Sequence, residues 1–142
     1  LIAKMTLLHQ NFANSIFVPA QEACITALEE CIPDSEKMTE SYEKRRNLII
    51  KGLNDIKGLS CVTPGGAFYT FTNISEFGMC SRDFCLKVLE ETKAVTVPGV
   101  GFGQSTDGLN LDNYIRLSYA TSEENINEFL NRMNDFSQKF FG

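Results

Sequence analysis

One arginine in an apolar strand is the residue of this sequence best suited to binding an anion. Residues 114–120, Tyr-Ile-Arg-Leu-Ser-Tyr-Ala, alternate in a way that is typical of a strand with two different faces. Ile115, Leu117 and Tyr119 share one face, and Arg116 lies on the other. An arginine on a rigid strand presents a planar guanidinium that can bind a carboxylate or phosphate through two hydrogen bonds. The spacing therefore makes Arg116 a candidate anion-binding residue.

A structural role explains Arg116 better than anion binding does as long as only the spacing is considered. Arginines are common on solvated strand faces, where their ion pairs contribute little to stability, and they also occur in internal ion pairs. The structural explanation is therefore the default for Arg116 until other residues point to a site.

The composition indicates a folded chain of ordinary polarity. The 142 residues are enough for one domain with a real core, and 43% hydrophobic with 22% charged residues argue against disorder. No apolar run is long enough to span a membrane, and we expect a soluble, cytoplasmic protein. The net charge of −5 argues against nucleic acid and anionic membranes as partners.

The cysteines do not form a metal-binding or disulfide pattern. The sequence has five cysteines, without a CxxC pair, and one histidine. We therefore expect no metal site and interpret the cysteines as small buried hydrophobic residues. They are Cys24, Cys31, Cys61, Cys80 and Cys85.

The elements around Arg116 follow from hydrophobic spacing. Helical spacing is found in residues 1–8, 19–31, 35–55, 81–93 and 121–141, with a loop from His9 to Val18. Strand-like runs occupy 59–62, 67–72, 94–97 and 114–120. This order predicts an α+β fold in which helices pack on one face of a small mixed sheet. Because no residue before Leu1 could cap the first helix, we expect a piece of a longer protein.

Capping residues predict where three of the helices begin. Asp34 or Ser35 can cap the long helix, Ser81 the next one, and Thr121 with Glu124 forms a capping box for the last. Pro19 suits the first turn of its helix.

The glycine-rich runs do not predict a nucleotide site. Residues 98–103, Pro-Gly-Val-Gly-Phe-Gly, follow a predicted strand, but no helical pattern follows them that could bind a pyrophosphate. Gly65 and Gly66 are interpreted as a turn, because the Lys-Ser or Lys-Thr of a phosphate loop is missing.

Three separated segments resemble the C-terminal region of the class I aminotransferases, the fold-type I enzymes that use pyridoxal phosphate. They are residues 64–71 (PGGAFYTF), 97–103 (VPGVGFG) and 115–120 (IRLSYA, followed by TSEENI). The segments occur in the family's order, and the resemblance extends over nearly the whole chain. Within the family, the chain most resembles the aspartate aminotransferases.

The resemblance implies roles for two residues and a division into domains. Arg116 matches the arginine that binds the substrate α-carboxylate, and Phe68 matches an aromatic residue near the substrate. Residues 1–31 would be the tail of a large cofactor-binding domain, and residues 32–142 the small C-terminal domain. Residues 11–15 resemble, loosely, a loop near the dimer interface of relatives, which implies a homodimer.

The resemblance also implies that the catalytic and cofactor-binding residues lie upstream of this chain. Lys4, Lys51, Lys57 and the other lysines match no Schiff-base motif. The parent enzyme would pass an amino group from an L-amino acid, with aspartate as a candidate, to a 2-oxo acid through pyridoxal phosphate, and this chain alone would be inactive. Two alternatives stay open: a free-standing, non-catalytic module that binds amino acids or proteins, and a folding fragment without activity.

Overall fold

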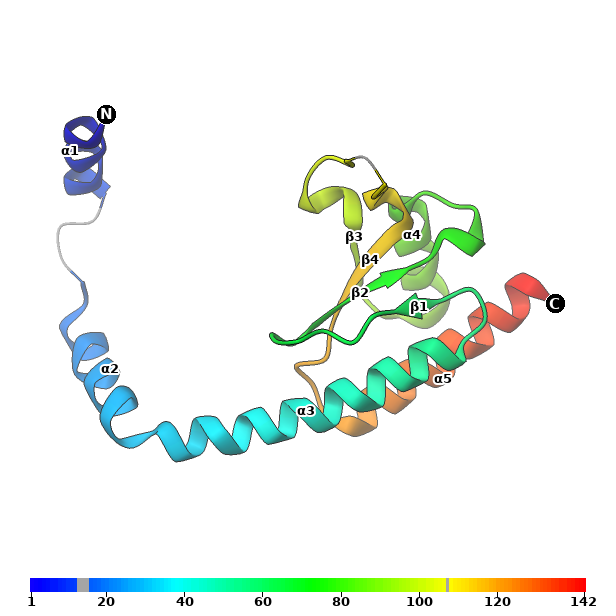
Figure 1. Cartoon of the computed structure of the whole chain (residues 1–142), viewed down its shortest axis with the longest axis horizontal. Helices are drawn as coiled ribbons and strands as arrows, with labels where there is room; N and C mark the ends of the chain where they lie inside the picture. The colour runs from blue at the N-terminus through cyan, green and yellow to red at the C-terminus, as the bar shows by residue number, and fades with distance from the viewer. Residues whose placement is uncertain (13–15, 107) are drawn as a thin grey trace. The chain divides into compact units, whose positions relative to one another are not determined.

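A computed structural model describes residues 1–12, 16–106 and 108–142 of the chain (Figure 1). The chain divides into two compact units, Leu1–Thr39 and Glu40–Gly142. The predicted domain boundary after residue 31 stays a prediction. Of the predicted interface loop at residues 11–15, residues 13–15 lie outside the described part of the chain.

The first unit is helical. It contains α1 (Ile2–Phe12), α2 (Val18–Glu30) and the beginning of α3 (Ile32–Asp55). Pro19 lies in the first turn of α2, which confirms its predicted position. The predicted loop from His9 is wrong at both ends, because α1 continues to Phe12 and α2 already begins at Val18.

The start of α3 also differs from the prediction. The helix begins at Ile32, so that Pro33 and Asp34 lie in its first turn and neither Asp34 nor Ser35 is the cap. Proline fits this turn because its fixed φ is helical and the N–H that it lacks would have had no partner inside the helix.

The second unit is built around a four-stranded sheet with the strand order β1-β2-β4-β3. The strands are β1 (Ser60–Cys61), β2 (Tyr69–Asn73), β3 (Val97–Pro98) and β4 (Tyr114–Ser118). The α+β class is confirmed, but every described strand pair is antiparallel, where a mixed sheet was predicted. Between β3 and β4 the chain passes through the short 3-10 helices η2 (Gly99–Phe102) and η3 (Leu111–Asn113) and returns antiparallel beside the strand it has left.

Helices cover one face of this sheet. The second half of α3, α4 (Ser81–Thr92) and α5 (Glu123–Phe141) supply most of the core, together with the inward side chains of β4. Figure 1 shows α3 and α5 running beside each other, and a side chain at Gly52 of α3 would overlap the side chain of Leu130 of α5. The least exposed large core side chains are Leu53, Ile74, Phe84, Val88, Ile115, Tyr119, Ile126 and Met133.

Two predicted helix caps are displaced by one residue. Cys80 caps α4 by accepting a hydrogen bond from the Asp83 N–H at 3.5 Å, and Ser122 caps α5 by accepting one from the Asn125 N–H at 3.3 Å. Ser81 is instead buried in the first turn, where its N–H and Oγ donate to Asp112 at 2.7 and 2.8 Å. Ser81 is therefore the first residue of the helix rather than the residue before it, and its hydroxyl is directed to the Asp112 carboxylate instead of accepting from an N–H of the first turn.

Asp112 joins η3 to the start of α4, and its removal should destabilise the second unit. We expect Asp112→Ala to lower the free energy of unfolding of the 142-residue chain by about 2–4 kcal/mol, because two charge-assisted hydrogen bonds and a favourable helix-dipole interaction are lost. Urea unfolding measures the change. Asp83→Ala removes an exposed carboxylate from the same turn and should cost less than about 1 kcal/mol; equal losses in the two variants would contradict the role of Asp112.

The cysteine prediction is confirmed for Cys61 and Cys85, which are buried. Burial raises the pKa of both thiols above the ordinary value, so they stay neutral hydrophobic groups. The prediction is wrong for Cys24 and Cys80, which are exposed, and Cys31 is only half-buried. Cys24 lies on α2, a helix without buried residues in this structure, and Cys80 lies at the start of α4, where it is the cap.

Candidate functional site

The strand β4 separates an apolar face from a polar one, as predicted from its sequence. Ile115 and Leu117 point into the core, and Tyr119 follows them there just after the strand. Arg116 is half-buried on the opposite face. Its register partners are Phe71 of β2 and Val97 of β3, so Arg116 lies between two strands rather than at a sheet edge.

Two aromatic rings contact the guanidinium of Arg116. The Arg116 Cζ atom lies 4.4 Å from the centre of the Tyr69 ring and 4.8 Å from the centre of the Phe102 ring. Both distances are within the range of cation–π interactions. In the described part of the chain, no acidic side chain forms an ion pair with Arg116 and no side-chain hydrogen bond involves it. No described side chain therefore occupies the N–H donors of Arg116, which can bind a ligand.

More aromatic rings extend the surface around Arg116. The Phe71 ring stacks on the Tyr114 ring with centroids 5.0 Å apart and an interplanar angle of 4°, and Phe102 meets Phe71 edge-on at 6.0 Å. The result is a cation set in an aromatic surface on the sheet face opposite the helices. Such a surface can bind a small anion that also carries an apolar part.

Phe68 lies at the edge of this aromatic surface. Its ring is 4.4 Å from the Tyr69 ring and stacks on Tyr42 of α3 at 5.8 Å. The side chain is 37% exposed, so Phe68 is not a core residue. Phe68 thus contacts Tyr69, which in turn contacts Arg116; its predicted role near a substrate stays a prediction.

The backbone before Phe68 is held in an unusual conformation by Tyr119. Ala67 has a φ of 60°, in the left-handed region that costs a residue with a side chain about 1–2 kcal/mol. Tyr119 donates from its hydroxyl to the Ala67 carbonyl and from its N–H to the Phe68 carbonyl, both at 2.9 Å. Burial raises the pKa of the Tyr119 phenol, which therefore remains a hydrogen-bond donor.

Gly99 places Phe102 over the arginine. A side chain at Gly99 would overlap the carbonyl oxygen of Leu111 and lie 2.7 Å from that of Tyr114. Only glycine allows η2 to approach the backbone of η3 and β4 so closely. Because Phe102 ends η2, this contact fixes the ring next to Arg116.

The three sequence segments that resemble one family meet at this place. Residues 64–71 supply Tyr69 and Phe71, residues 97–103 supply Gly99 and Phe102, and residues 115–120 supply Arg116. Sequence reasoning identified Arg116 but missed Tyr69 and Phe102 as its neighbours. An aromatic residue inside a glycine-rich run was the available signal for Phe102.

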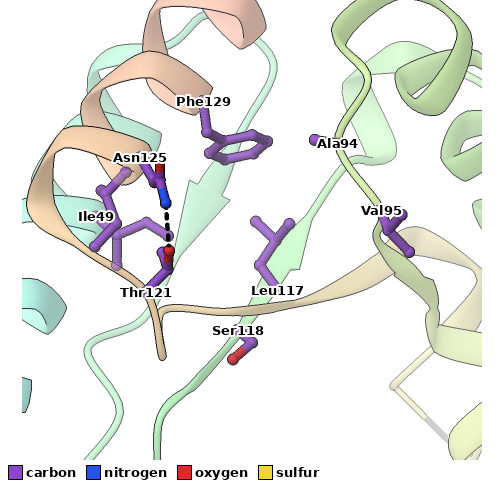
Figure 2. A pocket seen from close by; sticks show the side chains of 9 residues that line it. Ile49, Ala94, Val95, Leu117, Ser118, Thr121, Asn125 and Phe129 are labelled. Atoms are coloured by element: carbon purple, nitrogen blue, oxygen red, sulfur yellow. Dashed lines mark hydrogen bonds between the residues drawn. The ribbon is translucent and has the colours of Figure 1, made fainter.

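A cavity of about 340 Å³ lies between α3, α5 and the segment before β3 (Figure 2). Figure 2 shows Ile49, Leu117 and Phe129 around it, together with the hydrogen bond from Asn125 Nδ2 to Thr121 Oγ1 at 2.9 Å. None of its nine lining residues is charged. This cavity has no cation to pair with an anion, and we therefore take the surface around Arg116 as the candidate site.

The described residues contain neither a metal-binding cluster nor a membrane-spanning helix. Within 1–12, 16–106 and 108–142, no three histidine, cysteine or acidic side chains gather where they could hold a metal ion. No helix in these ranges combines the length and the apolar character needed to cross a membrane.

Comparison with known proteins identifies the family. Residues 1–133 match the family model described as aminotransferase class I and II. The chain is 44% identical over 135 residues to a putative aminotransferase, YugH, of Bacillus subtilis, a match that covers 95% of this chain and 33% of that protein. It is 39% identical over 134 residues to an aspartate aminotransferase of Pyrococcus horikoshii, covering 93% of this chain and 33% of the relative.

The structural comparison agrees with the sequence comparison. The solved structure of the aspartate aminotransferase from Thermus thermophilus with maleate superposes with a TM-score of 0.81 at 31% identity, covering 94% of this chain and 34% of that one. The chain thus spans about one third of the length of the relatives that it matches. By sequence and by fold, the chain belongs to the class I and II aminotransferase family.

Proposed function

We propose that this chain is the C-terminal part of a parent aminotransferase that moves an amino group between an L-amino acid and a 2-oxo acid, and that Arg116 binds the substrate carboxylate. The observation that carries the proposal is the guanidinium of Arg116 on the sheet face opposite the helices, in contact with two rings, where the three family-like segments meet. Aspartate is the candidate amino acid, because relatives at 39% identity are aspartate aminotransferases.

The role of Arg116 follows from the chemistry of the two substrates. Amino acid and 2-oxo acid both carry a carboxylate beside the reacting carbon, so one arginine can hold both in the same orientation. Two parallel N–H···O hydrogen bonds fix the direction of the carboxylate as well as its position. Phe68, which contacts Tyr69, is proposed to lie near the substrate side chain.

Pyridoxal phosphate, when bound, supplies the electron sink that amino-group transfer needs. The site around Arg116 consists of one cation and aromatic rings. It can bind a substrate carboxylate, but it contains no lysine that could link to the cofactor. Two lysines with aromatic contacts lie elsewhere: Lys57 is 4.9 Å from the Phe141 ring and Lys87 is 5.5 Å from the Phe140 ring. Because no lysine of this chain matches a Schiff-base motif, we propose that the cofactor is held mainly by residues of the parent protein outside this chain.

The domain organisation and the oligomeric state are part of the same proposal. Residues 1–31 would complete the large domain and residues 32–142 form the small one, in a homodimeric parent. Large exposed apolar side chains on residues 1–31 support packing of this segment against another part of the parent, since they need a covering surface. They include Leu1, Ile2, Phe12, Phe17 and Leu28, each at least 72% exposed.

The kinetic test of the proposal uses the parent protein. The Michaelis constants for the amino acid and the 2-oxo acid are measured before and after Arg116→Ala. If both constants stay unchanged, Arg116 does not bind the carboxylate and the assignment fails.

A second prediction concerns the 142-residue chain alone. Mixed with pyridoxal phosphate, it should give no visible absorption band from a lysine-linked cofactor and should not transaminate, because its lysines match no cofactor-binding motif. Absorption spectra before and after borohydride reduction measure the linkage, with the parent protein as the positive control. A lysine-linked band in the short chain would show that the proposed location of the cofactor site is wrong.

A further inference from the structure

We propose that Tyr69 and Phe102 form an aromatic clamp that positions the guanidinium of Arg116 for carboxylate binding. The inference rests on the proposed function of Arg116 and assigns positioning roles to two residues that the sequence did not single out. Their rings lie 4.4 and 4.8 Å from the Arg116 Cζ atom and belong to different elements, β2 and η2.

Ring faces are well suited to hold an arginine that must bind a ligand. A ring attracts the cation through its face without using the N–H donors, which stay free for a carboxylate. Hydrogen bonds from an acidic side chain would fix Arg116 too, but they would occupy the same donors. Among the described residues no such partner is present, and the two rings are the groups that the structure shows in contact with the guanidinium.

The gain from the clamp is pre-organisation. A long arginine side chain loses rotational freedom when it binds a ligand, and this loss weakens binding. A guanidinium that is already held between two rings has less freedom to lose. We therefore expect the clamp to act on substrate affinity rather than on the chemical step.

Each ring has its own structural support. Tyr69 lies opposite Ser118 in the β2–β4 register, and its ring packs against Phe68 at 4.4 Å. Phe102 is placed by the close approach of Gly99 to the backbone of η3 and β4 and meets Phe71 edge-on at 6.0 Å. The clamp is thus built into the fold before any ligand binds.

The direct test is the NMR signal of the Arg116 Nε–H group in the 15N-labelled 142-residue chain, assigned with Arg116→Lys. Ring currents from Tyr69 and Phe102 should shift this proton away from the value of a free arginine. Tyr69→Leu and Phe102→Leu should each move the signal back toward that value, whereas Tyr69→Phe should preserve it. An unchanged signal in both leucine variants would overturn the clamp.

Tyr114→Leu is the matched control for the NMR test. Tyr114 lies on the same face of β4 but stacks on Phe71 rather than on Arg116. Its replacement should leave the Nε–H signal in place. The backbone amide spectrum checks that each variant is folded. If one leucine variant unfolds, the other still decides the test, because an unchanged signal there would overturn the contact of its ring.

Kinetics in the parent protein complete the test. Each leucine variant should raise the Michaelis constant for the amino acid by about three- to tenfold with kcat changed less than about twofold, and Tyr69→Phe should behave like the wild type. Normal Michaelis constants in both leucine variants, beside an impaired Arg116→Ala, would overturn the positioning role. If instead Arg116→Ala itself is normal while the NMR shifts follow the rings, it is the proposed function that fails.

Discussion

Arg116→Ala in the parent protein is expected to lower kcat/KM by about 10²- to 10⁴-fold for the amino acid and for the 2-oxo acid alike. The estimate follows from two charge-assisted hydrogen bonds of about 1.5–3 kcal/mol each, with every 1.4 kcal/mol worth about a factor of ten. Both substrates lose the same partner, so the Michaelis constants should rise together. Steady-state kinetics with each substrate varied in turn measure the effect.

Two further arginine variants separate the geometry of the interaction from its charge. Arg116→Lys keeps the positive charge but loses the planar fork, and it should fall between the wild type and Arg116→Ala. Arg82→Ala removes an exposed arginine from α4, and its kinetics should be those of the wild type. A loss confined to kcat, or one shared by Arg82→Ala, would argue against carboxylate binding by Arg116.

Stability provides a separate check on this interpretation. Arg116 forms no ion pair with the described residues but contacts two rings, so Arg116→Ala should lower the free energy of unfolding by only about 1–2 kcal/mol, the worth of two cation–π contacts. A severe loss of stability would instead indicate a structural role for Arg116.

Gly99→Ala is expected to cost about 1–3 kcal/mol of folding free energy, because the new side chain would collide with backbone rather than with a flexible side chain. The added Cβ would overlap the Leu111 carbonyl oxygen and lie 2.7 Å from that of Tyr114. To relieve the collision, η2 must move away from η3 and β4, and Phe102 must move with it. Urea unfolding of the 142-residue chain measures the loss of stability.

Gly101→Ala is the matched control, since it lies in the same 3-10 helix. A side chain there has no atom within 4 Å, and the change should stay within about 0.5 kcal/mol. In the parent protein Gly99→Ala should also raise the Michaelis constants, because the ring beside Arg116 is displaced. Equal stabilities for the two alanine variants would show that the close approach of η2 is not needed.

Several features of the fold could be predicted because they depend on near neighbours in the chain. The alternation in β4 put Ile115 and Leu117 in the core and Arg116 on the other face, since side chains of a strand alternate whatever it pairs with. Pro19 lies in the first turn of α2 for an equally local reason, its fixed φ.

Predictions failed where a distant residue competed with a local one. Ser81 has the sequence of a helix cap, but Asp112, far along the chain, accepts both its N–H and its hydroxyl hydrogen, and Cys80 is the cap instead. The prediction of a mixed sheet was wrong as well. The chain returns from η2 and η3 so that β4 runs antiparallel to β3, and strand spacing alone does not reveal this direction.

The sequence by itself determined that Arg116 stands on the polar face of a strand and, through the family resemblance, which ligand to expect there. Only the tertiary structure decided what surrounds it. Tyr69 and Phe102 reach Arg116 through the register of β2 with β4 and through the contact of Gly99 with the backbone of η3, and both depend on residues far apart in the chain. Local spacing sets the face on which a side chain lies, whereas its neighbours on that face are set by long-range pairing.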